Sequence, residues 1–314
     1  MSMIAKQIDG YILPPGIDIF ERGWLSANNI LLYGDEDISL VDTGYCAHQQ
    51  LTVDLLANAL NQHGLSSLNK IVNTHLHSDH CGGNAALSKQ FGPEIWIPEA
   101  EAIAVGHWDE NLLSFQQLGQ DCPRFTHQGL LVPGEEIVLG CYRWQILSAP
   151  GHDNHSIMLY QEQHQILISA DALWEEGFGA IFPELWGEGG FEEVAKTLEL
   201  IEGLSVALVI PGHGKPFTDV KKSIAIAKSR LDYLSSDADR NARHAAKVLL
   251  KYKLLEWRSR KIKAAHQWIN TTPVLENIRK QLHMTVEDFQ EWLLQALVKS
   301  NAAVIEQDCL INLD

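Results

Sequence analysis

The spacing of hydrophobic and polar positions changes near residue 217. Before that point, short apolar and β-branched runs bounded by Gly, Pro or Asp alternate with stretches whose apolar residues recur at helical spacing. The runs predicted as strands are 28–34, 37–44, 70–75, 94–98, 142–150, 156–161, 165–171 and 207–214. The stretches predicted as helices are 48–62, 84–91, 99–118 and 190–203. Strands in meanders mixed with crossover helices predict an α+β fold with mixed sheets covered by helices.

Beyond Phe217 the strand signals vanish until the last dozen residues. A long helical pattern with a break near 235–237 is followed by three shorter helices, which are predicted at about 261–270, 273–282 and 285–299. The end of the chain, NAAVIEQDCLINLD, has two apolar runs around a polar turn and predicts a hairpin. We therefore expect two domains, residues 1–217 and a helical C-terminal module at 218–314. Three helices and a terminal hairpin are compatible with a winged-helix arrangement.

Charge divides the chain in the same way. With 46% hydrophobic and 20% charged residues, the 314-residue chain has an ordinary globular composition and a formal net charge of -16. Residues 1–219 carry 8 Lys and Arg against 29 Asp and Glu, whereas residues 220–314 carry 16 against 11. Such a difference indicates two modules with different surfaces. The acidic body would repel a polyanion at long range unless metal ions supplied local positive charge.

Targeting signals and cysteine usage favour a cytoplasmic protein. No apolar run approaches the roughly 20 residues that span a bilayer, so we expect no membrane association. The start of the chain, MSMIAKQIDGYILPPG, lacks the basic, apolar and small-residue order of a secretory signal. The 5 cysteines are odd in number and follow no framework spacing, which indicates reduced thiols.

The stretch NTHLHSDHCGGN holds the first candidate chemistry, because His75, His77, Asp79 and His80 lie within six positions. Their spacing does not place them on one helical face, where ligands fall at i and i+4. It suits a loop that leaves the predicted strand at 70–75 and turns tightly on two glycines. Imidazole and carboxylate groups together suit zinc, iron or manganese.

Three further side chains follow predicted strands in comparable contexts. His152 follows a strand in a Pro-Gly turn, Asp171 ends another strand, and His213 lies in a second Pro-Gly turn. Binding sites gather at the carboxyl ends of strands in sheets of this kind. Any one of these residues, His152 above all, could be a hydrogen-bonded structural residue. All seven together argue for a metal centre.

These motifs resemble those of the metallo-β-lactamase-fold superfamily of hydrolases. The matching stretches, which cover about residues 8–217, are VDTG, THLHSDHCGG, PGH, SAD and PGHG. The resemblance implies a four-layer αβ/βα sandwich with two divalent metal ions at one edge, zinc first, with iron or manganese as alternatives. It implies one metal held by His75, His77 and His152, a second held by Asp79, His80 and His213, Asp171 bridging both, and Asp42 orienting a ligand from behind.

Three positions qualify the match. Cys81 replaces another small or apolar residue common in relatives; we expect a buried hydrophobe, with a cysteine ligand as the alternative. Asp153 stands where threonine is common, which leaves the support of the neighbouring ligand open. His77 stands where oxygen-reducing diiron relatives carry glutamate, which disfavours a redox role.

The resemblance implies hydrolysis by a hydroxide that bridges the two metals. Asp171 is the expected bridging ligand, and Asp79 is expected to bind metal, orient the nucleophile and transfer a proton. The motifs look most like those of hydroxyacylglutathione hydrolases (glyoxalase II-like) and neighbouring cytosolic thioesterases, which predicts a thioester or related activated ester as substrate. Alternatives are a lactonase, a ribonuclease or phosphodiesterase using the basic C-terminal module, and a sensor that binds ligand without turnover.

Substrate contacts are predicted from charge and aromatic residues. A cationic helix over 240–263, with Arg243 and Lys247, could bind an anionic substrate; a solvated helix face is the alternative. Trp174 and Phe178 follow Asp171 and could contact an acyl chain, although core packing is the simpler role.

Nucleic acid is disfavoured as a partner. The third helix of the C-terminal module carries Glu287, Asp288 and Glu291 near its start, where a DNA- or RNA-reading helix meets its target. The module is expected to pack on the catalytic body or on a second subunit of a homo-oligomer.

Overall fold

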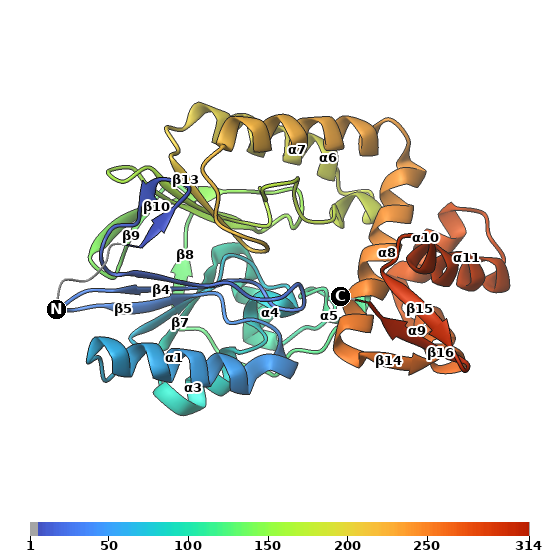
Figure 1. The fold of residues 1–314 in the computed structure, drawn as a ribbon, viewed down its shortest axis with the longest axis horizontal. Helices are drawn as coiled ribbons and strands as arrows, with labels where there is room; N and C mark the ends of the chain where they lie inside the picture. Colours follow the sequence, from blue (N-terminus) through green and yellow to red (C-terminus); the bar gives the residue numbers. More distant parts are fainter. Residues whose placement is uncertain (1–5, 314) are drawn as a thin grey trace.

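The computed structural model describes residues 6–313. Residues 1–5 and 314, the ends of the two predicted domains, lie outside the described residues. The start of the stretch tested for a secretory signal lies outside them as well. One mixed sheet has the order β3-β4-β5-β6-β7-β8, antiparallel from β3 to β5 and parallel from β5 to β8 (Figure 1). Its strands are β3 (Ile17–Phe20), β4 (Asn29–Tyr33), β5 (Ile38–Val41), β6 (Lys70–Val72), β7 (Glu94–Pro98) and β8 (Gly129–Leu131).

The second sheet has the order β13-β12-β11-β10-β9 and is antiparallel except between β12 and β13. Its strands are β9 (Glu136–Leu139), β10 (Tyr142–Ser148), β11 (Ile157–Gln161), β12 (Ile166–Ala170) and β13 (Leu208–Pro211). A two-stranded hairpin, β1 (Gln7–Ile8) and β2 (Tyr11–Ile12), precedes both sheets in the chain.

Alternation along the buried strands explains why the sheets stack. Side chains point to opposite faces at successive positions of a strand. On β4, Ile30 and Leu32 therefore face the second sheet, where they share a core with Trp144 and Ile168. Leu31 faces the other way and packs in the core beneath the outer helices.

Helices cover both outer faces. α1 (Gln49–His63) and α3 (Asn84–Phe91) lie on the first sheet, and α6 (Gly190–Gly203) and α7 (Val220–Ser235) lie on the second (Figure 1). The predicted αβ/βα sandwich is confirmed. α7 shares a buried core with α6, whereas the next helix packs in a different core. The change falls at residues 236–237, where Asp237 caps that next helix. The domain boundary predicted after residue 217 stays a prediction.

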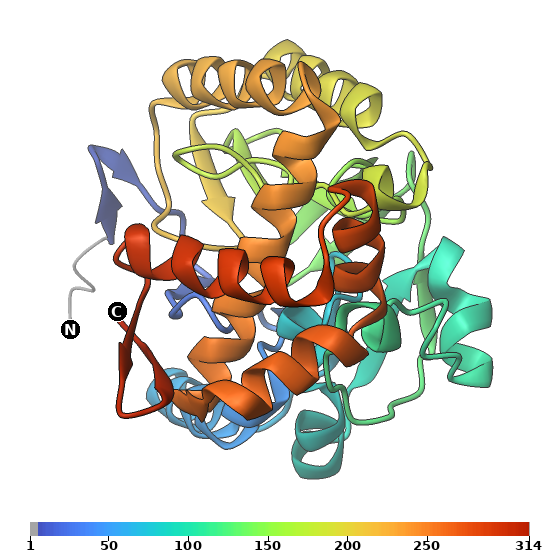
Figure 2. The same cartoon turned by 90° about the vertical axis from the view of Figure 1, so that its right-hand side faces the viewer.

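From α8 (Ala238–Trp257) onward the chain forms a separate group of elements, to which we now restrict the name C-terminal module, while α7 belongs to the sandwich. This module packs against one side of the sandwich. α8 runs along this side from the level of α7 to that of α1 (Figure 2). The rest consists of β14 (Ser259–Lys261), α9 (Ile262–Thr271), α10 (Pro273–Gln281), α11 (Val286–Lys299), β15 (Ala303–Glu306) and β16 (Cys309–Asn312). The three strands form a sheet of order β14-β16-β15. The predicted helices and terminal hairpin are present, and the name winged helix stays a prediction.

The core of the module extends into the sandwich. Leu118 and Phe182 of the sandwich belong to the same buried cluster as Leu250 of α8 and Leu293 of α11. Of the helices in residues 6–313, none is both long and apolar enough to cross a membrane.

The helix predicted over 99–118 is wrong as one element. The chain instead forms a 3-10 turn η2 (Glu99–Glu101), α4 (Ala102–His107) and α5 (Phe115–Leu118). Trp108 adopts a left-handed conformation with φ 55°, which ends α4. The carboxylate of Asp109 then accepts the backbone N–H groups of Asn111 and Leu112, so a local polar turn competes successfully with the helix.

Candidate metal centre

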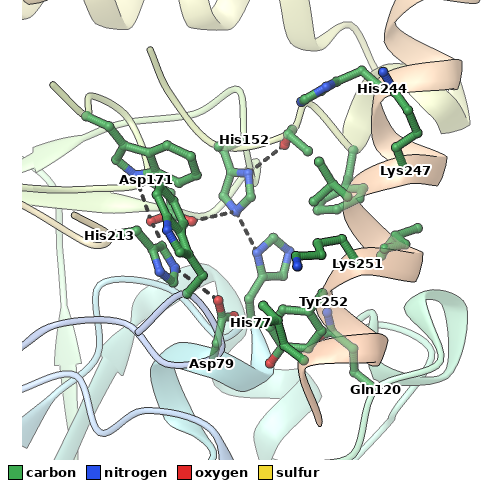
Figure 3. A pocket seen from close by; sticks show the side chains of 18 of the residues that line it. His77, Asp79, Gln120, His152, Asp171, His213, His244, Lys247, Lys251 and Tyr252 are labelled. Carbon is green, nitrogen blue, oxygen red and sulfur yellow. Dashed lines mark hydrogen bonds and ion pairs between the residues drawn. The ribbon is translucent and has the colours of Figure 1, made fainter. Parts of the chain in front are cut away.

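Strand ends bring the predicted ligands to one edge of the sandwich. His75 and His77 follow β6, and Asp79 and His80 lie on the single turn α2 (Ser78–Cys81). His152, Asp171 and His213 follow β10, β12 and β13. Figure 3 shows side chains from these separate loops pointing toward one another. The seven residues that the sequence indicates therefore lie together, although their role as metal ligands stays a prediction.

The two glycines after His80 act through close packing. A Cβ atom on Gly82 would lie 2.5 Å from the backbone nitrogen of Cys46 and from the carbonyl oxygen of Ser78. On Gly83 it would lie 2.4 Å from the carbonyl oxygen of Thr43. Neither glycine has positive φ. The motif needs these glycines because the loop after β5 crosses directly against α2.

The first cluster contains three imidazoles. His75 Nε2 lies 3.1 Å from His77 Nδ1, which lies 2.8 Å from His152 Nε2. The three rings are buried, and their nitrogen atoms converge closely enough to share one metal ion.

The second cluster contains Asp79, His80 and His213, and Asp171 lies between the clusters. His213 Nε2 is 3.1 Å from Asp79 Oδ2. Asp171 Oδ1 is 3.4 Å from His80 Nε2, and Asp171 Oδ2 is 3.3 Å from His152 Nε2. Because its two oxygens face different clusters, Asp171 has the position of a bridging ligand.

Partners behind the imidazoles fix which nitrogen faces inward. Asp42 accepts the Nδ1–H of His80 at 2.7 Å and also binds the backbone and hydroxyl of Thr74. The carbonyl of Ala180 accepts the Nδ1–H of His152 at 2.5 Å. Hydrogen bonds of this kind set the tautomer and orientation of a metal-binding histidine. The inward nitrogens of His80 and His152 are therefore Nε2.

Asp153 lies behind a third imidazole, that of His77. Its Oδ2 lies 3.7 Å from Nε2 of His77, on the side of the ring opposite the first cluster. The departure from threonine noted in the sequence thus places a carboxylate behind a candidate ligand, where a second partner is needed.

Charge in the centre is divided between ionised carboxylates and neutral imidazoles. Burial alone would raise the pKa of Asp171, but His80 and His213 hold it well below its ordinary value. Burial and the neighbouring His77 lower the pKa of His152 to about 4. Burial also lowers the pKa of His75, together with the imidazoles around it. Carboxylate oxygens and unprotonated imidazole nitrogens are the forms that bind divalent metals.

Two buried nitrogens provide a test of whether a metal fits. Within the described part of the chain, His80 Nε2 and His213 Nδ1 have no hydrogen-bond partner, although both are inaccessible to solvent. Buried polar atoms are rarely left without a partner. A metal ion next to Nε2 of His80, between Asp79 and Asp171, would satisfy that atom, so the donor set fits the two-metal interpretation.

A cavity of about 490 Å³ opens from the centre toward the C-terminal module. Trp174 and Lys247 line it, and their role in substrate binding stays a prediction. Among the described residues, the lining does not include Phe178 or Arg243. Phe178 is buried in the core under α7, and the Arg243 guanidinium lies 5.0 Å from the ring centroid of Trp292.

Four lining residues carry no motif that sequence reasoning could use. Gln120 follows α5, Arg230 lies on α7, and His244 and Tyr252 lie on α8. They line one cavity because α8 packs across the open side of the sandwich and brings His244 and Tyr252 to the same space as Gln120 and Arg230, although these residues are far apart in the chain. Cys81 is fully buried with its sulfur 3.7 Å from that of Cys122, on the core side of α2.

The chain thus forms an αβ/βα sandwich with His and Asp clusters at one edge that could hold metal. The model of the Metallo-beta-lactamase superfamily matches residues 22–213, which is more than half of the chain. The protein belongs to this superfamily.

Individual relatives agree with that assignment. A "Probable metallo-hydrolase" of Methanocaldococcus jannaschii is 26% identical over 198 residues, covering 60% of this chain and 88% of that protein. A hydroxyacylglutathione hydrolase of Brucella ovis is 30% identical over 124 residues, which is 40% of each chain. The crystal structure of a metallo-beta-lactamase family protein from Thermus thermophilus covers 96% of this chain and 99% of its own, with a TM-score of 0.57 and 18% identity.

Proposed function

We propose that the protein hydrolyses a thioester or a related activated ester with the help of two divalent metal ions, zinc first. The observation that carries the proposal is the convergence of two buried clusters joined by Asp171, at the end of a cavity large enough for a small molecule. Similarity to a hydroxyacylglutathione hydrolase supports a thioester, and the match spans less than half of that relative.

The residues of the centre divide the work. His75, His77 and His152 would hold one ion, and Asp79, His80 and His213 would hold the other. Asp171, ionised and facing both clusters, would fix their separation. Ions held there would supply Lewis acidity toward a water molecule and the carbonyl oxygen of the substrate.

Proton transfer is assigned to Asp79. Its Oδ2 lies 3.1 Å from His213 Nε2, and the neighbouring His213 and His80 help keep the pKa of Asp79 low despite burial. Asp79 also lines the cavity, so its carboxylate can orient a water molecule and pass the proton to a leaving group. A thiolate leaving group needs this help least, because a thiol is the stronger acid.

The cavity wall favours a small substrate. Apolar side chains, including Phe182, Leu249 and Leu297, line it, and Trp174 donates its indole N–H to Asp171 at 3.3 Å beside the centre. Such a lining suits an acyl group or a pantetheine-like arm.

The test is a substrate panel assayed with zinc, manganese and iron. We expect acylglutathione or acyl-CoA thioesters to be hydrolysed at least tenfold faster, by kcat/KM, than lactones, and single-stranded RNA to remain intact. Preferred cleavage of lactones would assign the protein as a lactonase. Cleavage of RNA that is lost both in Asp79→Ala and on reversal of the charges on α8 would assign it as a ribonuclease. If the protein binds two ions per chain but hydrolyses no member of the panel, it would be assigned as a sensor that binds ligand without turnover.

A further inference from the structure

The cavity has a cationic end away from the metal centre. Arg230 of α7 and His244 and Lys247 of α8 line it there. In Figure 3, His244 and Lys247 project from α8 on the side of the cavity opposite Asp79 and His213. The sandwich and the C-terminal module thus each contribute to the same end of the cavity.

The guanidinium of Arg230 is packed in a narrow slot formed by His244, Phe178 and Gly177. Its Nη2 donates to His244 Nε2 at 2.7 Å, and its guanidinium lies 5.1 Å from the ring centroid of Phe178. Gly177 closes the slot, because a Cβ atom there would lie 2.6 Å from Arg230 Nη1. Gly177 also has φ 123°, a conformation that favours glycine. The guanidinium is therefore positioned by the side chains and backbone around it and is not a flexible surface group.

Within the part of the chain that the structure describes, no carboxylate pairs with the cations at this end. Between residues 6 and 313, no Asp or Glu carboxylate lies within 4.0 Å of the charged nitrogens of Arg230 or Lys247. By contrast, Lys253 on the same helix contacts both Asp121 and Glu256. Burial, with Arg230 and Lys247 beside it, lowers the pKa of His244 to about 3, so this imidazole is neutral and can accept the hydrogen bond from Arg230.

A half-buried cation without a counter-ion is unfavourable, and an anion supplied by a ligand would relieve the cost. Arginine presents a planar pair of donors that matches a carboxylate or a phosphate. Apolar side chains such as Leu249 also line the cavity, and Phe182 lies next to the metal centre, with its ring centroid 5.5 Å from that of His77.

We propose that Arg230, His244 and Lys247 form a binding subsite for an anionic group, carboxylate or phosphate, on the part of the substrate remote from the scissile bond. This inference rests on the proposed function, because it assumes that the ligand is the substrate. It narrows the substrate class to an anionic ester or thioester. Arg230 and Lys247 contact the anion, and His244 positions Arg230 through Nε2.

The binding experiment separates the two sources of the anion. Coenzyme A offers phosphates and glutathione offers carboxylates, and neither needs to be turned over. We expect one of them to bind the zinc-loaded protein in isothermal titration calorimetry, with about 10–100-fold weaker binding to Arg230→Gln, because a hydrogen bond to a charged group contributes about 1.5–3 kcal/mol. Arg230→Lys should keep part of the affinity. Arg143→Gln, an exposed arginine near Glu136, is the matched control and should bind as the wild type does.

The kinetic experiment uses a charged and an uncharged thioester. We expect Arg230→Gln and Lys247→Gln to raise KM for acyl-CoA or acylglutathione about tenfold or more, with kcat within threefold. The uncharged acyl-N-acetylcysteamine should be hydrolysed equally by all variants. Lys247→Gln keeps the test informative if Arg230→Gln fails to fold.

The failures are distinguishable. Affinity for coenzyme A and glutathione that is unchanged in both variants overturns the subsite, even if thioesters are hydrolysed. Binding that depends on Arg230, without hydrolysis of any thioester, leaves the subsite standing and overturns the proposed reaction.

Discussion

The sandwich and the C-terminal module build the cavity in different ways. In the sandwich, the candidate ligands lie in loops after strand ends or, for Asp79 and His80, on the short turn α2. His77, His80 and His152 each have an oxygen atom behind the ring. In the module, most of the lining residues fall on one face of α8 at helical spacing, from His244 to Leu255, Leu297 comes from α11, and no motif marks them. The geometry of the metal centre thus depends on contacts within and between neighbouring loops. The wall of the cavity opposite it depends on how α8 packs against the sandwich.

Charge sharpens the difference. The sandwich concentrates carboxylates, and its centre requires cations to balance Asp79 and Asp171. The module is basic, and its helix offers cations that require an anion. A molecule that is neutral at its reacting carbonyl and anionic at its far end would match both parts.

The largest effect is expected from the residue that joins the two clusters. Asp171→Asn removes the charge that faces both of them, so we predict a loss of kcat of about 10³-fold or more, in the range typical of single groups that stabilise a transition state. Steady-state kinetics on the preferred thioester and metal content by plasma mass spectrometry would measure it. Asp35→Asn, in an exposed turn, is the control. Retention of a tenth of the activity would contradict the bridging role.

Core truncations compare the stability of the two regions. Leu40→Ala in the sandwich and Leu293→Ala in the module each remove a fully buried side chain, so we expect each to lower the free energy of unfolding by about 2–5 kcal/mol. Because Leu118 and Phe182 connect the two cores, calorimetry should show one shared transition. Two separate transitions, with Leu293→Ala moving only one of them, would instead show that the module unfolds independently.

The partners behind the imidazoles should have graded effects. Asp42→Asn leaves the size of the side chain but removes the charge 2.7 Å from His80 Nδ1, and we expect about 10–100-fold weaker metal binding. Asp153→Asn should have the smaller effect, because its oxygen lies 3.7 Å from His77 Nε2. Competition with a chromophoric chelator measures both. Equal affinities for the two variants and the wild type would mean that these carboxylates do not orient the ligands.

The smallest effect concerns pH. The pKa of His244 falls from 6.5 to about 3 on folding, through burial and through Arg230 and Lys247. Below pH 6.5 the unfolded chain binds a proton that the folded chain does not, so this group stabilises the fold above that pH and the contribution is lost as pH falls toward 3. His244→Gln should therefore lose less stability than the wild type between about pH 7 and pH 5. Urea titrations of the wild type and the variant at the two pH values would measure the difference. Equal losses of unfolding free energy in the two proteins would contradict the prediction.

The sequence predicts the sandwich well because its strands are apolar runs buried on both faces. It misses β3, β8 and β9, which are short or interrupted by charge, as at Asp18 and Glu136. It indicates all seven candidate ligands, since each follows a strand in a distinctive turn. It does not indicate Arg230, because the partner of Arg230 is on another helix and its slot depends on Gly177. It names Phe178 and Arg243 as candidate substrate contacts beside the simpler alternatives of core packing and a solvated helix face, and it cannot choose between them, because proximity in sequence does not reveal the direction of a side chain.

The single face of α8 has a practical consequence for protein engineering. Positions 244, 247, 248, 251, 252 and 255 line the cavity from one uninterrupted helix. A combinatorial library confined to these codons would vary the acceptor for the remote end of a ligand while leaving the loops of the reacting centre untouched. New selectivities could then be selected within one short cassette of the gene.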